Sequence, residues 1–181
     1  STQPVKLDAY NGKKAEFIIS GDKLFVKSFD ASNDTFSLFR HTVTNGVVSA
    51  AEMLDASIKT CDIIGTNVWY QRSVTGSSLC DLYKYSAEKE KIDGDVASFA
   101  ELPDGSVLIV KNFVSSADGE IADLYLYDGK KTSLVAEKVE LKNMKYSDKG
   151  ISFIRSGGDL CIYSKNKLAI IGGGAYNIIA Y

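Results

Sequence analysis

A short pattern recurs four times along this chain, and its spacing constrains the fold more than any other feature. In each copy an apolar run ends in a basic residue that is followed by Ser or Asn. The basic residues are Lys27, Arg72, Lys111 and Arg155, which lie 45, 39 and 44 positions apart. Near-even spacing of this kind indicates copies of one supersecondary unit, each covering the apolar face of its neighbour.

A second apolar run follows each basic residue after a loop of variable length. Asp81–Tyr85, Asp123–Tyr127 and Asp159–Tyr163 are close copies of one string, and Thr35–Phe39 is a weaker copy. Most of the chain reads as short alternating runs separated by Gly, Asn, Asp and Ser, which is typical of strands and turns. Only Val48–Ala56 could form a turn or two of helix.

Each repeat divides into four predicted strands. They cover residues 16–20, 23–29, 35–43 and 47–52, then 58–64, 68–73, 81–86 and 90–93, then 97–102, 106–113, 123–127 and 132–137, and finally 141–146, 150–155, 159–163 and 168–172. A period of about 40–45 residues made of short strands is typical of propeller blades. We therefore predict an all-β, β-propeller-type array of about four four-stranded antiparallel blades, either closed or part of a larger propeller.

We expect one domain over residues 1–181, with repeats at about 15–56, 57–96, 97–139 and 140–181. The links between the second and third strands are long and polar in the first three repeats, at 30–34, 74–80 and 114–122. In an antiparallel blade these links share one end with the crossovers between blades. That elaborated end is the expected binding surface.

The two ends of the chain resemble pieces of a blade. Residues 5–14 read as a third strand with its turn, and residues 176–181 read as a spare first strand. Together they could complete a ring, or they could be edges of a longer array. Exposed edges favour pairing with a second copy, so a homodimer is one predicted arrangement.

The string Asp123–Lys131, preceded by Leu102–Ser106, resembles the repeats of bacterial β-propeller proteins. The resemblance is to the broad group containing YWTD-like and related extracytoplasmic propellers, and it extends over roughly residues 15–172. It implies the propeller architecture and an extracytoplasmic or cell-surface location, with a cytoplasmic location left open. It assigns a catalytic role to no residue of this chain.

Composition narrows the classes of partner. A net charge of −2 and a pI near 5.5 argue against a nucleic-acid-binding surface, and the apolar runs fall short of the roughly 18 residues that span a bilayer.

The three cysteines, Cys61, Cys80 and Cys161, lack metal-like spacing and are expected to be small buried thiols without a bridge between Cys80 and Cys161. The one histidine, His41, is expected on the surface of a strand. We predict no cofactor and no metal.

The recurring basic residues are the sharpest candidates for a ligand site. Cations at equivalent positions in a ring would attract an anionic ligand into a concave mouth. A structural alternative explains the same recurrence: each cation would pair across strands with an acid of the following run. Those acids are Asp34, Asp81, Asp123 and Asp159.

Other candidates lie in loops and among the aromatic residues. Asp30, Asp118 and Glu120 could bind a ligand or contribute oxygens to Ca²⁺, although neither loop has the alternating acids of a dedicated calcium site. Trp69 could stack on a sugar together with nearby tyrosines. The structural alternatives are solvated loops for the acids and packing between blades for the aromatic rings.

The sequence thus predicts a non-catalytic binding or interaction module of a surface-attached or secreted bacterial protein. Its ligand would be an unknown protein, a small molecule or a glycan. The alternatives are a carbohydrate-active enzyme that uses loop carboxylates, and the sensor domain of a membrane-anchored regulator.

Overall fold

The computed structural model describes residues 10, 12–32, 34–65, 67–116, 119–147, 150–165 and 167–175, and these form an all-β structure. The strands are β1 Ala15–Ser20, β2 Lys23–Phe29, β3 Phe36–Thr44, β4 Val47–Val48, β5 Glu52–Ile64, β6 Asn67–Ser73, β7 Cys80–Tyr85, β8 Lys89–Glu101, β9 Val107–Ser116, β10 Gly119–Tyr127, β11 Thr132–Ser147, β12 Gly150–Arg155, β13 Asp159–Ser164 and β14 Lys167–Gly172. The predicted all-β class is confirmed.

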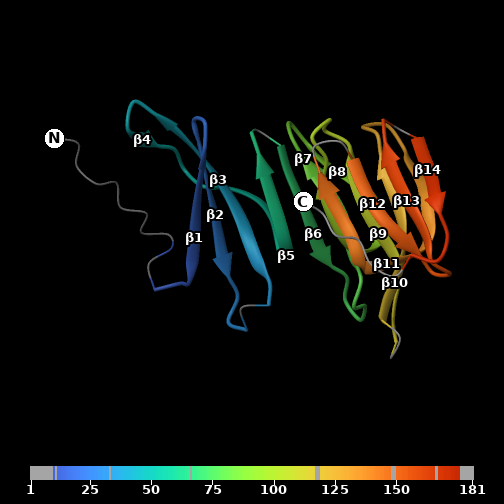
Figure 1. Ribbon diagram of the computed structural model, residues 1–181. Coiled ribbons are helices and arrows are strands. Elements are labelled where there is room, and N and C mark those ends of the chain that lie inside the picture. The colour runs from blue at the N-terminus through green and yellow to red at the C-terminus, as the bar shows by residue number, and fades with distance from the viewer. Residues whose placement is uncertain are drawn as a thin grey trace. The chain divides into compact units, whose positions relative to one another are not determined.

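Strands that follow one another in sequence pair with one another in space (Figure 1). The hydrogen-bonded order runs from β1 to β14, with β4 attached only to β3. Within the described residues β1 and β14 are the two ends of this order, so the array is not closed. This consecutive antiparallel order resembles part of a β-propeller.

The chain divides into two compact units, Ser1–Gly94 (unit 1) and Asp95–Tyr181 (unit 2). The boundary falls inside β8, close to the predicted end of the second repeat at about residue 96.

Three long strands each join the last strand of one repeat to the first strand of the next. These are β5, β8 and β11, and each contains one residue with positive φ: Ser57 at 58°, Asp95 at 55° and Lys138 at 53°. Non-glycine residues seldom adopt this backbone conformation. It marks the point where the strand leaves one blade for the next, and the strand pairing shifts register close by.

These three positions define four blades. Blade 1 consists of β1, β2, β3 and the beginning of β5, and blade 2 of the rest of β5, β6, β7 and the beginning of β8. Blade 3 consists of the rest of β8, β9, β10 and the beginning of β11, and blade 4 of the rest of β11, β12, β13 and β14.

Two predicted segments form differently. The expected fourth strand of repeat one, 47–52, is wrong because Asn45 and Gly46, both at positive φ, turn the chain so that Val47–Val48 only extends the β3 hairpin. The suggested helical turn over Val48–Ala56 is also wrong, since β5 begins at Glu52. The predicted loop 114–122 contains a continuation of the β9–β10 hairpin, with Val114 opposite Ile121.

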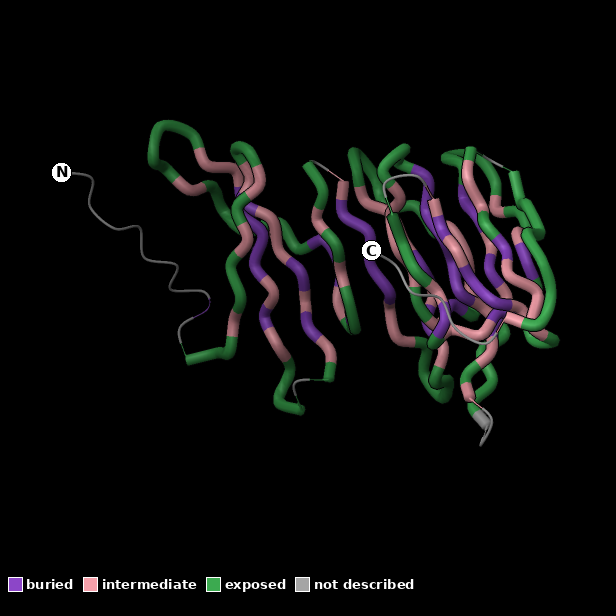
Figure 2. The backbone as a smooth tube through the Cα atoms, in the orientation of Figure 1, coloured by how far each residue is buried: buried purple, intermediate pink, exposed green. Residues whose placement is uncertain are grey.

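The core lies along the central strands of each blade (Figure 2). In unit 1 one cluster joins blades 1 and 2 and contains Phe25, Phe36, Leu38, Leu54, Ile58, Val68 and Tyr70. In unit 2 the corresponding cluster joins blades 3 and 4 and contains Leu108, Val110, Ala122, Leu124, Ala136, Val139, Ile151, Phe153 and Cys161. No helix among the described residues is long and apolar enough to span a membrane.

The histidine and the cysteines are structural. His41 is buried, which corrects the prediction of a surface position: its Nε2 lies 2.9 Å from the Tyr10 hydroxyl and its Nδ1 lies 2.9 Å from the Ser49 carbonyl oxygen. The three cysteines are free thiols; Cys80 and Cys161 are buried as predicted, whereas Cys61 is only partly buried. Burial raises the pKa of Cys61 to about 11. A thiol with such a pKa stays protonated near neutral pH and is a poor nucleophile.

Candidate functional site

Strand register places three of the four predicted basic residues directly opposite the expected acids. Arg72 faces Asp81 across β6 and β7, and the equivalent pairs in β9–β10 and β12–β13 join Lys111 to Asp123 and Arg155 to Asp159. Lys27 instead lies opposite Leu38. The repeated register is confirmed in three blades and is wrong in blade 1.

Lys27 and Arg72 occupy equivalent positions in the repeat, but their side chains point in opposite directions. Its ammonium group lies over the Phe36 ring, 5.4 Å from the centroid, and 3.5 Å from Glu16, on the side of blade 1 that faces blade 2. Arg72 points from blade 2 back toward blade 1, where its Nε lies 3.8 Å from Asp55. Because neighbouring strand residues alternate between faces, a shift of one residue is enough to reverse the direction of a side chain.

Two of the recurring acids have partners other than the basic residues that lie opposite them. Asp81 forms an ion pair with Lys91, at 2.7 Å. Asp123 accepts hydrogen bonds from the Asn112 side chain, at 2.7 Å, and from the backbone N–H of Lys138, at 2.9 Å. Since Lys138 is the positive-φ residue of β11, the Asp123 carboxylate fixes the crossover between blades 3 and 4. In this blade the recurring acid therefore has a structural role.

The most developed polar cluster lies inside unit 1, at the joint between its two blades. Asp55 of β5 is 9% exposed and accepts a hydrogen bond from the Tyr70 hydroxyl, at 3.0 Å. Besides Arg72, it contacts the Lys89 ammonium group, at 2.7 Å, and the backbone N–H of Ala56, at 2.9 Å. Lys89 also lies over the Tyr83 ring, which stacks on Tyr70. A buried charge of this kind requires such partners.

The same joint continues with a second, more exposed group. The Arg40 guanidinium donates two hydrogen bonds to Glu52, at 3.1 and 2.7 Å, and lies over the Tyr85 ring. The Tyr85 hydroxyl donates to the other oxygen of Glu52, at 2.9 Å. The two groups lie at the same joint and are hereafter together called the joint network: Arg40, Glu52, Asp55, Tyr70, Arg72, Tyr83, Tyr85 and Lys89.

Protonation follows from these contacts. Burial works to raise the pKa of Asp55, but Lys89, the Ala56 N–H and Tyr70 outweigh it and hold that pKa below its usual value. The hydrogen bond from Arg40 lowers the pKa of Glu52. Burial, and then the neighbouring Asp55 charge, raises the pKa of Tyr70. At neutral pH Glu52 and Asp55 are thus ionised and the Tyr70 phenol is protonated. These protonation states suit a structural role better than proton transfer.

The predicted site residues Asp30 and Trp69 lie outside the joint network. Asp30 accepts hydrogen bonds from Ser32, at 2.8 Å, and from the backbone N–H and hydroxyl of Thr35, so it organises its own turn. Trp69 is 2% exposed, with the Lys84 ammonium group over its ring. Asp118 lies outside the described residues.

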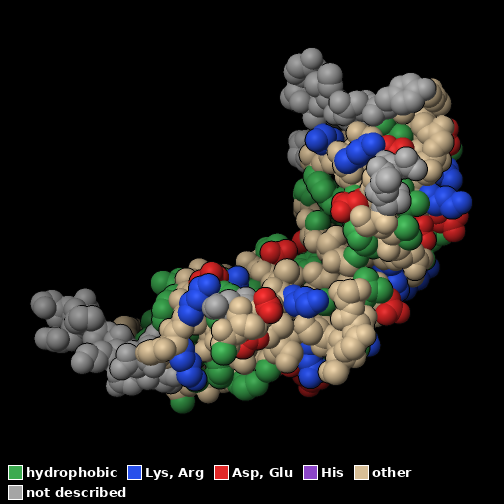
Figure 3. All heavy atoms as spheres, turned by 90° about the horizontal axis from the view of Figure 1, so that it is seen from below, with side chains coloured by type: hydrophobic (Ala, Val, Ile, Leu, Met, Phe, Trp, Pro, Cys, Tyr) green, Lys and Arg blue, Asp and Glu red, His purple; other side chains and the backbone are tan. Residues whose placement is uncertain are grey.

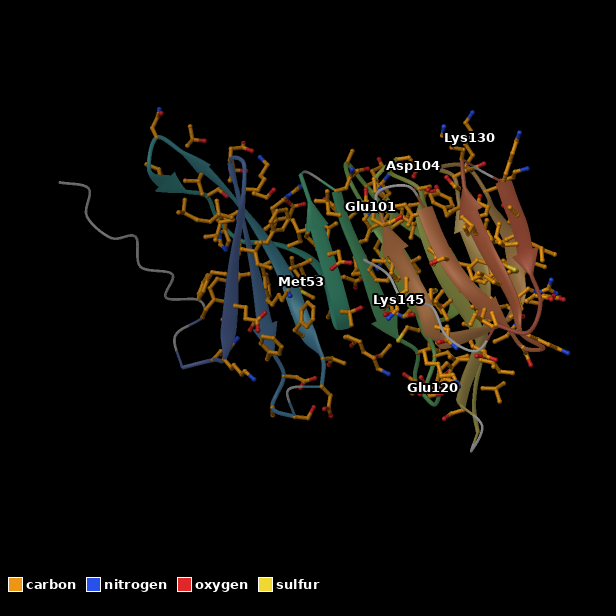
Figure 4. All side chains as sticks on the ribbon, in the orientation of Figure 1. Met53, Glu101, Asp104, Glu120, Lys130 and Lys145 are labelled. Carbon is orange, nitrogen blue, oxygen red and sulfur yellow. The ribbon has the colours of Figure 1, made fainter. Side chains whose placement is uncertain are left out.

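Glu120 is exposed near the end of the β9–β10 hairpin (Figure 4). Asp104 and Lys130, in turns of the same unit, lie at the other end of the strands. The predicted separation of two ends is therefore visible in unit 2. Apolar side chains accompany Glu120 on the hairpin, since Phe113 is 38% exposed and Val114 is 52% exposed.

Charge is not concentrated on the face seen in Figure 3, where Lys and Arg side chains are interspersed with Asp and Glu. Among the described residues, His, Cys, Asp and Glu form no group of three or more that could hold a metal ion. The described site residues of unit 1 take the separate places given above, and so do those of unit 2.

Sequence reasoning missed the joint network. One signal was present: Asp55 is a charged residue within the mostly apolar run Met53–Ala56. The interpretation of that run as part of a helical turn concealed it. The partners Tyr70 and Lys89 come from other strands, so only the folded chain brings them to Asp55.

No family model and no curated protein matches the sequence. Solved structures do match the fold. The β-propeller domain of the trilobed protease from Pyrococcus furiosus aligns with a TM-score of 0.55 at 13% identity, over 88% of this chain and 58% of that one. The acylaminoacyl peptidase of Pyrococcus horikoshii aligns with a TM-score of 0.56 at 17% identity, over 87% of this chain and 27% of that one.

These similarities show the fold alone, because identity is so low. The chain spans 58% of the first of these proteins and 27% of the second. The fold is thus an open antiparallel array that resembles part of a β-propeller.

Proposed function

We propose that this chain is a non-catalytic binding or interaction module, of the kind carried by surface-attached or secreted bacterial proteins. The observation that carries the proposal is the β9–β10 hairpin of unit 2, which extends by Val114–Ser116 and Gly119–Ile121 beyond the rest of its blade. It exposes Phe113 and Val114. Exposed apolar residues on a loop of a rigid scaffold are common in binding surfaces.

The rest of the chemistry supports binding over catalysis. Asp30 and the acids of the joint network are held by neighbouring donors within the protein. A general acid or base needs a pKa near the working pH. The lowered pKa values of Glu52 and Asp55 move away from that range. The YWTD-like extracytoplasmic group remains our proposed affiliation.

The test compares a hairpin variant with a matched control. In the hairpin variant Val114 and Glu120 are changed to Ser and Lys, and in the control Asp104 and Lys130 are changed to Asn and Gln at the opposite end of unit 2. The wild type and the two variants are immobilised and exposed to a glycan array and to a bacterial cell-surface extract. Quantitative mass spectrometry then identifies what each protein retains from the extract.

The proposal predicts ligands that the wild type and the control retain and the hairpin variant loses. Retention that is equal in all three proteins would contradict a binding role for the hairpin. Hydrolysis of a glycan by the wild type, lost when Asp30 is changed to Asn, would replace the proposal with the enzymatic alternative.

A further inference from the structure

The β9–β10 hairpin has one edge that lacks a neighbouring strand. β8 pairs with β9 only as far as Lys111, because the part of β8 before its positive-φ residue, Asp95, belongs to blade 2. β9 itself continues to Ser116, and within the described residues β10 alone pairs with this continuation. The hairpin projects beyond the other strands of unit 2 (Figure 1). Residues Asn112–Ser116 are hereafter called the free edge.

The opposite side of the hairpin is occupied. There β11 runs beside β10, with Glu140 opposite Ile121. The Lys142 ammonium group lies 3.9 Å from the place that a Cβ on Gly119 would take. The two sides of the hairpin therefore differ, since one is next to β11 and the other is open.

Strand alternation shows which backbone groups the free edge presents. In an antiparallel sheet, successive residues direct their N–H and C=O groups to opposite neighbours. The Asp128 N–H donates to the Lys131 carbonyl, at 3.2 Å, so the even-numbered residues of β10 point to β11 and the odd-numbered ones, including Ile121, to β9. β10 is regular, because the extra residues at the register shifts belong to β9 and β11. Val114 therefore bonds to Ile121, and Ser115 directs its N–H and C=O outward.

The side chains of the free edge leave it unprotected. Asn112–Ser115 are exposed at four successive positions, so neither face of this segment is covered. Strand edges of soluble proteins are commonly protected by charged residues or Pro, and Glu16 in β1 is an example in this chain. The free edge contains neither. Its bulge, at the positive-φ residue Asn112, lies at its base and leaves the residues beyond it extended.

We propose that the free edge binds an extended polypeptide segment of a partner protein, which adds to the hairpin as a third strand. This inference rests on the proposed binding role of the hairpin and names the chemistry of the partner. An extended polypeptide repeats N–H and C=O groups at the spacing of a strand edge, which a glycan does not. Phe113 and Val114 point to opposite faces, so the adjoining residues of the partner meet an apolar side chain on each face. An uncharged, β-branched segment fits best.

The test selects peptides from a phage-displayed library of random short sequences, with the full chain as bait. Enriched peptides are then synthesised and their affinities are measured by calorimetry. Ser115→Pro removes an outward N–H and is expected to weaken binding about tenfold. Ser115→Ala, which keeps that N–H, is the matched control and should bind as the wild type does. Proline is tolerated at an edge whose N–H faces solvent, and circular dichroism checks that the strands are intact.

Methylation of the peptide backbone makes the test specific. A strand added to an edge directs only every second N–H toward that edge. N-methyl groups at alternate positions of the peptide should therefore abolish binding, whereas those at the intervening positions should be tolerated. Recognition through side chains alone has no such alternation. Slower hydrogen exchange of the Ser115 amide in the complex locates the contact.

Several results would overturn the inference. The library could enrich no peptide, or Ser115→Pro and Ser115→Ala could bind equally. The N-methyl series could show no alternation, or the protected amides could lie along β14 instead. Light scattering that finds a dimer of the wild type, lost in Ser115→Pro, would make a second copy of the chain the occupant in place of a partner protein.

Failure of this inference can be told apart from failure of the proposed function. If the hairpin variant with Val114 and Glu120 changed retains every ligand, the hairpin has no binding role and both proposals fail. If that variant loses a glycan that Ser115→Pro and Ser115→Ala retain equally, the hairpin binds its ligand without strand addition, and only the inference fails.

Discussion

The two joints between neighbouring blades, one in each unit, are built from different chemistry at the same position. In unit 1 the residue two places before the positive-φ residue of β5 is Asp55, and in unit 2 the residue two places before that of β11 is Ala136. Both pair with a buried leucine, Leu38 and Leu124 respectively. Asp55 is held by hydroxyl, ammonium and backbone donors, whereas Ala136 lies in a cluster of apolar side chains.

The difference shows that one scaffold tolerates two ways of filling the space between blades. An aliphatic joint is stabilised by apolar burial and depends on packing without voids. A polar joint gains less net stability, because desolvation offsets much of the attraction, but it depends strongly on the presence of every partner. Substitutions at the two joints should therefore have different effects.

The largest effect is expected from putting the unit 1 residue into unit 2. Ala136→Asp introduces a carboxylate among Leu124, Val139 and their apolar neighbours, where the cluster offers it no cation. The free energy of unfolding of unit 2 should fall by about 3 kcal/mol or more. Urea unfolding followed by far-ultraviolet circular dichroism measures the loss, and Ser133→Asp at an exposed position of the same strand is the control. Equal stability of the two variants would mean that the unit 2 joint is not dry.

The reverse substitution should cost less. Asp55→Ala removes the acceptor of the buried Tyr70 hydroxyl and the ion-pair partner of Lys89. We expect a loss of about 2 kcal/mol, since the hydroxyl is left buried without its bond. Trp69, the single tryptophan, belongs to unit 1 and reports its unfolding by fluorescence. Glu52→Ala removes an exposed pair and should cost under about 1 kcal/mol; a larger loss there than at Asp55 would contradict the burial argument.

Acid should weaken the polar joint selectively. The pKa of Asp55 is lower in the folded chain than in the unfolded chain, so its contribution is fully present above the unfolded value of about 3.9 and is lost as the pH falls through the lower folded value. The stability difference between the wild type and Asp55→Asn should then shrink below about pH 4. Urea titrations of Trp69 fluorescence between pH 7 and pH 3 measure it, and a difference that grows on acidification would give the opposite sign.

The smallest effect is expected at the crossover of unit 2. Asp123→Ala removes the acceptor of the Lys138 backbone N–H and of the Asn112 side chain. Because these groups are accessible to water, the loss should be about 1 kcal/mol or less. Faster hydrogen exchange of the Lys138 amide is the direct readout, and Asp128→Ala in a distant turn of the same unit is the control. Unchanged exchange at Lys138 would show that the crossover holds its shape without Asp123.

The sequence alone predicted most of the strands. Lys23–Phe29 and Gly150–Arg155 form strands with the predicted bounds, because alternating apolar residues bounded by turn residues leave little freedom. The four-fold repeat predicted an array of short antiparallel strands, which the structure confirms. The segment after Asn45 was mispredicted because its short hairpin depends on a turn and not on a period.

The candidate site was less predictable. Lys27 belongs to the recurring basic set, but the register of β2 and β3 places it opposite Leu38 and not beside Asp34 as the paired alternative expected. Asp55, Tyr70 and Lys89 carried no common motif, since they come from three different strands.

The sequence by itself therefore determined the local structure: which segments are strands, where the chain turns and how often the unit repeats. The tertiary structure decided which way each side chain points and which charges meet. The physical reason is that strand periodicity and turn chemistry act over a few neighbouring residues, whereas register and packing between blades are fixed only when distant strands come together. In β2, for example, Phe25 packs toward blade 2 while its neighbour Val26 packs on the other face.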